Sequence, residues 1–158
     1  MNINHAKLIE DTEIVAWEPS SGVTLYDKLD EEVPDDSDYI VSTATTNTSK
    51  FKLSPLKKAI EGRLVVKFRA KSSDGTRMTV QLLEGSTLIA ERLYLDVSQS
   101  GYQQFGMVLT QAEIALITNA SALYLNFIGE HFIFILLGES GDRIALEDGT
   151  GVLLMENA

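Results

Sequence analysis

Apolar and polar residues alternate along most of the chain, and this period of two predicts β-strands with one buried and one solvated face. The clearest strand is predicted over residues 63–71. Its buried face carries Leu64, Val66, Phe68 and Ala70. Its solvated face carries Arg63, Lys67, Arg69 and Lys71, with Val65 among them.

Turn-forming residues separate further strands that have the same alternation. A Ser-Ser-Asp-Gly turn at residues 72–75 leads to a strand over residues 78–82, and we expect these first two strands to form a hairpin. Residues 84–86 form the next turn. The remaining strands are predicted over residues 14–17, 88–95, 102–109 and 123–127.

Capping residues predict a few short helices. Thr110 and Glu113 form a T-x-x-E capping box before a helix over residues 111–118. Two shorter helices are expected over residues 56–61, after Ser54 and Pro55, and over residues 25–30, after Thr24. In the last of these, Leu25 and Leu29 are four residues apart and would pack on the sheets.

Many short strands with regular turns predict an all-β fold, a jelly-roll β-sandwich with two or three short helices. The length of 158 residues suits one domain with a sizeable core. We expect an N-terminal arm over residues 1–12, the sandwich over residues 13–130 and a C-terminal β-hairpin ribbon over residues 131–158. The ribbon would serve packing or oligomerisation.

The expected ribbon contains an internal repeat, in which an apolar triplet precedes an acidic residue and a turn former. The three units span residues 135–141, 144–149 and 152–158. So short and apolar a ribbon should pack on its own sandwich, a sister subunit or another protein. The candidate interface residues in and beside it are Phe132, Phe134, Leu136, Ile144, Leu146, Val152 and Leu154.

The basic outer face of the strand over residues 63–71 has two interpretations. Lys67 and Arg69 are candidate interface residues, because a basic face in an acidic protein suits docking of an acidic partner. The same side chains are explained more simply as a solvated face that is paired with neighbouring acids.

Composition excludes several classes of function. The net charge is -10, which argues against a nucleic-acid binder and against binding to an anionic membrane surface. The chain has no cysteine, so disulfides, thiolate zinc sites and cysteine nucleophiles are excluded. The longest apolar run, residues 132–137, is too short to span a bilayer.

No catalytic or cofactor-binding motif is recognisable in the sequence. The two histidines, His5 and His131, stand in unrelated contexts, and no nucleophile elbow, dinucleotide-binding fingerprint or P-loop is present. A glycosidase-like pair of carboxylates needs a separation that sequence does not reveal. We therefore predict a protein that is not an enzyme and has no cofactor.

Three aspartates in the segment after the first short helix are the one candidate for a metal site. Asp35, Asp36 and Asp38 could contribute oxygens to a calcium ion, although the spacing does not match an EF-hand. Turn formation after Pro34 explains them more simply, because aspartates bond to their own backbone in turns.

Several segments, in order, resemble a jelly-roll domain that recurs in virion proteins of tailed bacteriophages. They are Trp17, residues 25–31, residues 34–40, residues 66–72, residues 80–85, residues 88–90, residues 109–113, residues 115–118, Leu123 and the C-terminal residues 146–156. Members of that family are mainly structural proteins, so the resemblance implies a jelly-roll fold and no catalytic residue.

The resemblance implies a capsid decoration (cement) protein that stabilises a phage head by contacts with its subunits. We expect it in the virion, assembled in the host cytoplasm as a homo-oligomer, with a trimer favoured. Its partner would be the major capsid protein or another virion protein, contacted through residues 1–12 and 132–155. The alternatives are a tail or fibre-attachment component and a carbohydrate-binding module for host-surface glycans.

Overall fold

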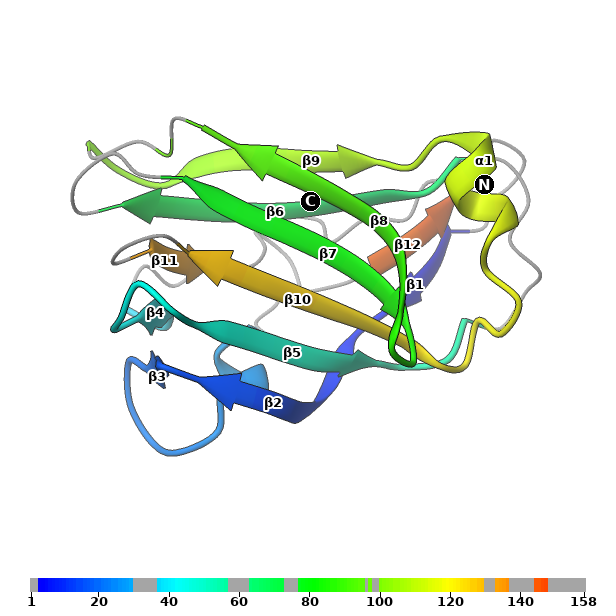
Figure 1. Ribbon diagram of the computed structural model, residues 1–158. Helices are drawn as coiled ribbons and strands as arrows, with labels where there is room; N and C mark the ends of the chain where they lie inside the picture. Colours follow the sequence, from blue (N-terminus) through cyan, green and yellow to red (C-terminus); the bar gives the residue numbers. More distant parts are fainter. Residues whose placement is uncertain are drawn as a thin grey trace.

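Two antiparallel sheets packed face to face form the body of the protein (Figure 1). The computed structural model describes residues 3–29, 37–56, 63–72, 77–95, 97, 100–129, 133–136 and 144–147. Within these residues each of the two sheets has five strands, and a separate sheet has two. The predicted all-β sandwich is therefore confirmed.

The strands of each sheet come from distant parts of the chain. The first sheet has the order β2 (Leu8–Val15), β5 (Thr48–Leu53), β10 (Leu123–Gly129), β7 (Met78–Glu84) and β8 (Thr87–Tyr94). The second sheet has the order β3 (Trp17–Pro19), β4 (Ile40–Ser42), β11 (Ile133–Leu136), β6 (Val65–Ser72) and β9 (Gln103–Val108). The small sheet pairs β1 (Ile3–Ala6) with β12 (Ile144–Glu147).

Eight of the strands pair in a nested series. The hairpin of β7 and β8 is the innermost pair, followed outward along the chain by β6 with β9, β5 with β10, and β4 with β11. All four pairs are antiparallel. Successive pairs alternate between the two sheets, so the chain is in effect one long hairpin that wraps around a common core.

The core lies between the sheets and uses the predicted apolar faces. Leu64, Val66, Phe68 and Ala70 are all buried, and so are Met78, Val80, Leu82, Leu123, Leu125 and Phe127. Phe68 lies at the centre of an aromatic cluster. Its ring centroid is 5.4 Å from that of Phe127 and 5.5 Å from those of Tyr94 and Phe105. The alternation therefore identified the buried face of each of these strands.

The predicted hairpin between residues 63–71 and 78–82 is wrong. β6 belongs to the second sheet and β7 to the first, and each pairs with other strands. Both strands have one apolar face. That face is buried equally well when the two strands lie in opposite sheets and when they pair side by side in one sheet. The period of two fixes which face is buried but not which strand is the neighbour.

The expected N-terminal arm is also wrong for residues 8–12, which lie in β2 and pair with β5. The register of β2 shifts between Leu8 and Glu10 and again between Asp11 and Glu13. Such bulges interrupt the alternation from which a strand is predicted. β2 ends at Val15, and Ala16, with a φ of 55°, turns the chain into β3 of the second sheet.

The C-terminal residues do not form the expected hairpin ribbon where the structure describes them. β11 lies between β4 and β6 in the second sheet, and β12 pairs with β1 rather than with β11. A continuous apolar run is typical of a strand that is covered on both faces, so the apolar run of residues 133–136 is compatible with a place inside the sandwich. The sandwich therefore extends past residue 130.

The helical predictions have different outcomes. α1 (Gln111–Ala115) begins with the predicted capping box, in which Thr110 and Glu113 bond to each other's backbone amides. The turn expected over residues 25–30 is a 3-10 helix, η1 (Tyr26–Leu29), and Leu25 and Leu29 are buried as predicted. The helix expected over residues 56–61 lies almost entirely outside the described residues. None of the described helices is long and apolar enough to cross a membrane.

Asn47 ties together three segments at one end of the sandwich. Its Oδ1 accepts bonds from the indole N–H of Trp17 and the backbone N–H of Gly129, both at 2.8 Å. Its amide nitrogen donates to the backbone carbonyl of Ala44, at 2.7 Å, and to that of Gly129. The side chain is buried, so these partners depend on it for their hydrogen bonds.

Candidate functional site

The residues that the sequence singled out do not form a single site. Asp38 accepts a hydrogen bond from the Ser20 hydroxyl at 3.0 Å and lies 3.4 Å from the Lys28 ammonium. Asp35 and Asp36 lie outside the described residues. Within the described ranges, no three side chains of the metal-binding types are grouped.

The basic interface candidates lie on the outer side of β6. Lys67 and Arg69 are partly buried. The Arg69 guanidinium is 5.6 Å from the ring centroid of Tyr102, and the Lys71 ammonium is 4.7 Å from the same centroid. These cation–π contacts place Arg69 and Lys71 against an aromatic side chain that directly precedes β9.

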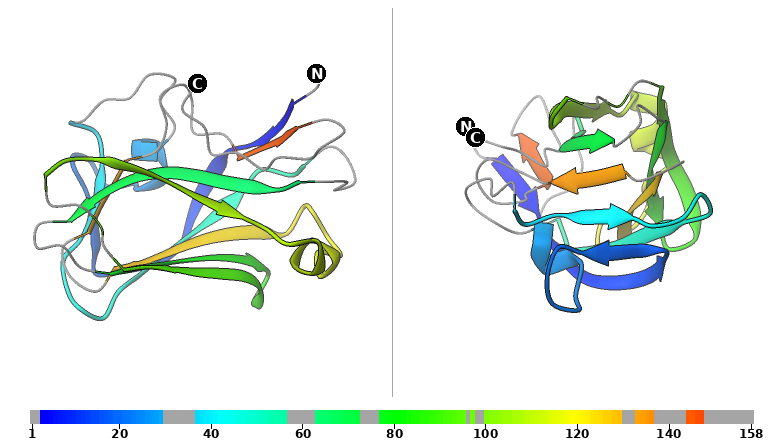
Figure 2. Two further views of the ribbon diagram at one scale, coloured as in Figure 1. Left: turned by 90° about the horizontal axis from the view of Figure 1, so that it is seen from above. Right: turned by 90° about the vertical axis from the view of Figure 1, so that its left-hand side faces the viewer.

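The apolar interface candidates are separated by the fold. Phe134 and Leu136 belong to β11 in the second sheet, whereas Ile144 and Leu146 belong to β12. Phe132, Val152 and Leu154 lie outside the described residues. β12 pairs antiparallel with β1, with Asn4 opposite Leu146. Figure 2 shows this pair on the far side of the second sheet from the first sheet, and β12 lies against β6.

A row of polar side chains crosses the outer face of the first sheet. The Thr48 hydroxyl donates to Asn126 Oδ1 at 2.7 Å, and Asn126 Nδ2 donates to Gln81 Oε1 at 3.0 Å. Gln81 Nε2 in turn donates to the Glu91 carboxylate at 2.6 Å. The four residues come from β5, β10, β7 and β8, so the row links four neighbouring strands.

Fixed groups at the two ends determine the direction of this row. The backbone N–H of Ser49 also donates to Asn126 Oδ1, at 3.1 Å, and a backbone amide is only a donor. At the other end, the Glu91 carboxylate accepts the bond from Gln81 Nε2. The amides of Asn126 and Gln81 are therefore aligned in one direction along the row.

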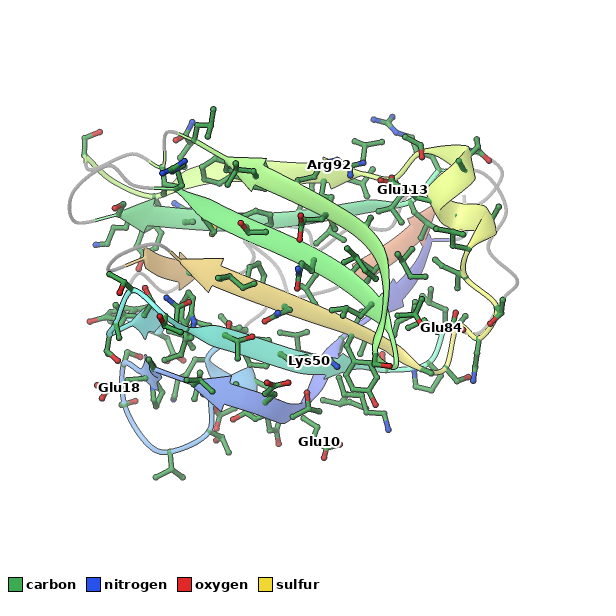
Figure 3. All side chains as sticks on the ribbon, viewed as in Figure 1. Glu10, Glu18, Lys50, Glu84, Arg92 and Glu113 are labelled. Atoms are coloured by element: carbon green, nitrogen blue, oxygen red, sulfur yellow. The ribbon has the colours of Figure 1, made fainter. Side chains whose placement is uncertain are left out.

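A hollow of about 240 Å³ opens on the same face, beside the polar row. It is lined by Thr12, Glu13, Lys50, Gly85, Ser86 and Tyr124. The Lys50 ammonium lies 4.7 Å from the Tyr124 ring centroid and donates to the carbonyl of Gly85 at 2.9 Å. Figure 3 shows Lys50 on β5 beside the turn that joins β7 to β8.

Residues from both sides of the first sheet line the hollow. Thr12 and Glu13 belong to β2, whereas Gly85 and Ser86 form the β7–β8 turn, and β5 and β10 lie between these strands. Gly85 has a φ of 60°, which glycine adopts readily, and its N–H donates to the Ala122 carbonyl at 2.9 Å. This bond holds the turn beside the start of β10.

The hollow has balanced charge and no aliphatic lining. Lys50 supplies one cation and Glu13 one anion, while Thr12 and Ser86 supply hydroxyl groups. The Thr12 hydroxyl donates to the Lys50 carbonyl at 2.8 Å, which leaves its oxygen as an acceptor. The arrangement suits recognition of a small neutral polar group.

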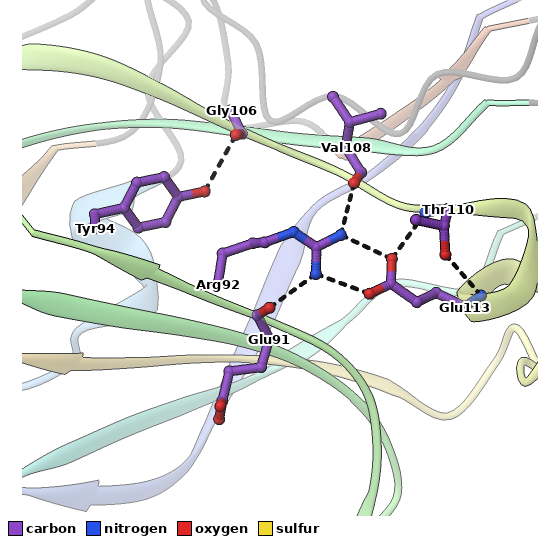
Figure 4. Close-up of polar contacts among 7 residues, drawn as sticks. All are labelled: Glu91, Arg92, Tyr94, Gly106, Val108, Thr110 and Glu113. Carbon is purple, nitrogen blue, oxygen red and sulfur yellow. Dashed lines mark hydrogen bonds and ion pairs between the residues drawn. The ribbon is translucent and has the colours of Figure 1, made fainter.

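A clasp closes the edge between the two sheets (Figure 4). Arg92 on β8 makes two bonds of 2.8 Å to the Glu113 carboxylate and donates to the Val108 carbonyl at 2.9 Å. Glu113 also accepts from the backbone N–H of Thr110 at 2.8 Å. The Arg92 guanidinium lowers the pKa of Glu113 to about 2, and the Glu113 carboxylate raises the pKa of Arg92.

Two neighbouring contacts complete the connections of this region. The Tyr94 hydroxyl donates to the Gly106 carbonyl at 3.1 Å, and burial raises the pKa of Tyr94 to about 12. The Glu84 carboxylate accepts from the Thr118 hydroxyl and from the backbone amides of Thr118 and Asn119, and these bonds lower the pKa of Glu84. These groups are satisfied within the fold, so their role is structural.

Sequence reasoning did not identify the hollow or the polar row. The sequence patterns assign Thr12 to an N-terminal arm and Lys50 to no strand, and they do not reveal which strands are neighbours. The alternating polar positions of β5 and β7 were the available signal. A search against family models and a search of curated proteins find no match to this chain.

Proposed function

We propose that this chain is a non-enzymatic structural protein of a tailed-bacteriophage virion, a decoration (cement) protein that stabilises the capsid. The starting point is the resemblance of several segments, which follow one another in the same order, to the jelly-roll domains of virion proteins. The nested pairing of β4–β11, β5–β10, β6–β9 and β7–β8 supports the jelly-roll assignment, because two interlocked Greek keys give this strand order.

The pairing of β1 with β12 is the observation that carries the proposal. The sequence predicts contacts through residues 1–12 and 132–155, and this pairing joins residues 3–6 of the first segment to residues 144–147 of the second in one small sheet. A two-stranded sheet is at best marginally stable by itself. The β1–β12 pair would therefore gain stability from a neighbouring capsid subunit as well as from β6.

The mechanism is burial of surface between neighbouring capsid subunits. Each bound copy would bridge subunits of the shell and resist their separation under internal pressure. Symmetric homo-oligomers are the common arrangement for such components, and a trimer fits a position on a capsid three-fold axis. The major capsid protein is the partner this proposal requires.

Binding to shells tests the proposal. Expanded capsid shells of the phage that encodes the chain, prepared without this protein, are incubated with it and separated by sedimentation. We expect co-sedimentation and greater resistance of the shells to heating. The variant Asn4→Pro removes a backbone N–H from β1 and should weaken binding. Asn4→Ala keeps that N–H and is the matched control.

The possible results separate the alternatives. Binding that Asn4→Pro weakens and Asn4→Ala preserves supports the proposal. No co-sedimentation, together with equal stability of virions with and without the protein, would contradict it. A particle reconstruction that places the protein on the tail would replace the capsid role by the tail or fibre-attachment role.

A further inference from the structure

We propose that the hollow on the outer face of the first sheet is a binding site for one unit of a neutral, hydroxyl-rich glycan. The site is formed by Glu13, Lys50, Ser86 and Tyr124, with the polar row beside it. It lies on the opposite sheet from the β1–β12 pair, so it is independent of the proposed shell contact.

The donors and acceptors of the hollow match a ring that carries several hydroxyl groups. The Lys50 ammonium has three N–H donors. One is used by the Gly85 carbonyl and one is directed toward the Tyr124 ring, which leaves one for a ligand oxygen. Glu13 is exposed, and its carboxylate is able to accept a hydrogen bond from a ligand. Neighbouring sugar hydroxyls could satisfy both groups at once.

Electrostatics favours a neutral ligand over a charged one. A phosphate or sulfate would be attracted by Lys50 but repelled by Glu13, in a chain whose net charge is -10. A cationic ligand would be repelled by the Lys50 ammonium. A hydroxyl group both donates and accepts, so it is compatible with both side chains.

The size and lining of the hollow favour a sugar over a peptide. Its volume of about 240 Å³ is below the range of about 300–1,000 Å³ typical of drug-sized ligands. Peptide side chains are usually held in apolar pockets, and none of the six lining residues is aliphatic. Tyr124 supplies an aromatic surface beside polar groups, a combination that also suits sugars.

Two features hold the site in a binding-competent arrangement. The cation–π contact and the bond to Gly85 fix the Lys50 ammonium before a ligand arrives, which lowers the entropic cost of binding. The row of Asn126, Gln81 and Glu91 continues from Lys50 across the sheet, because these residues are direct partners in the strand register. Further units of a glycan chain could contact this row.

A glycan array that carries neutral, sialylated and sulfated glycans tests the ligand class. We expect binding to neutral glycans. Titration of the best neutral oligosaccharide, followed by amide NMR shifts, should perturb Thr12, Gly85 and Ser86. A preference for sulfated or sialylated glycans, an absence of binding to every neutral glycan, or shifts confined to other surfaces would each overturn the proposal.

A matched pair of variants tests the residues. Lys50→Met removes the ammonium from the hollow and should raise the Kd at least tenfold. Lys52→Met makes the same change two residues along β5, on the same face but outside the lining, and should change the Kd less than twofold. Equal effects of the two variants would refute the assignment, provided that thermal unfolding shows both to be folded.

A second pair covers the case in which Lys50→Met does not fold. Glu13→Gln keeps the shape of the exposed side chain while changing its acceptor character, and should raise the Kd severalfold. Glu10→Gln, on the same strand and outside the lining, is its control. A Kd that Glu13→Gln leaves unchanged would contradict the role given to the carboxylate.

Discussion

Removing the charge of Glu113 should weaken the clasp between the sheets in a pH-dependent way. In Glu113→Gln the two charge-assisted bonds to Arg92 are lost, although a neutral side chain of the same shape remains. Glu113 also caps α1 through its bond from the backbone N–H of Thr110. The variant should therefore loosen the contact between β8 and the start of α1.

The expected loss in the free energy of unfolding follows from the lowered pKa of Glu113. A fall from the ordinary value of 4.5 to about 2 corresponds to at most about 3 kcal/mol, at 1.36 kcal/mol for each pH unit. The side chains of Arg92 and Glu113 are 32% and 21% exposed. Because solvent screens such a pair, we expect a loss of about 1–2 kcal/mol in the free energy of unfolding at neutral pH.

The sign of the pH dependence is determined by the lowered pKa in the folded state. The stabilisation is fully present above pH 4.5 and is lost as the pH falls toward about 2. Urea unfolding should therefore show a difference between the parent protein and Glu113→Gln that is largest at neutral pH. The difference should shrink across this window. The fluorescence of Trp17, the single tryptophan, reports the unfolding.

A variant that removes one exposed carboxylate elsewhere controls for the change in net charge. Glu18→Gln removes an exposed carboxylate on β3 and should change stability by less than about 0.5 kcal/mol. A difference for Glu113→Gln that is absent at neutral pH, or that stays constant down to pH 2, would refute the reasoning.

Three further variants test other contacts of the fold. Asn47→Ala leaves the Trp17 indole and the Gly129 backbone without their buried partner, so denaturant unfolding should show a loss of about 2–4 kcal/mol; a loss below about 1 kcal/mol would contradict this role. Because the raised pKa makes ionisation of Tyr94 unfavourable in the folded state, the parent protein should lose stability as the pH rises from 10 toward about 12. Tyr94→Phe should show less of this alkaline loss in urea unfolding, and an identical profile would contradict it. Glu84→Gln removes the charged acceptor of the backbone amide of Thr118, so hydrogen exchange at that amide should become faster, and unchanged exchange would argue against the anchoring role.

Local patterns were sufficient to predict the fold class and much of the core. The alternation of apolar residues in β6, β7 and β10 identified the buried faces, including Phe68 and Phe127. The spacing of Thr110 and Glu113 predicted the start of α1, because a capping box depends only on residues of one turn. Each of these features is determined by interactions within a few residues along the chain.

Long-range pairing could not be predicted from the same patterns. β11 is a central strand between β4 and β6, although the sequence pattern predicts its apolar run to be part of a ribbon outside the sandwich. Bulges in β2 interrupt the alternation of apolar and polar residues, so the pattern does not predict a strand over residues 8–12. The hollow combines Thr12, Lys50, Ser86 and Tyr124, which meet only because the sheet brings four segments together.

The nested order of the strands has a consequence for the order of folding. The hairpin of β7 and β8 is local, but β10 must insert between β5 and β7, and β11 between β4 and β6. Until residues 123–136 have been synthesised, both sheets remain divided and expose unpaired strand edges. Contacts so distant in sequence slow folding, and divided sheets are prone to aggregate. The nascent chain therefore depends on its last sandwich strands to close both sheets.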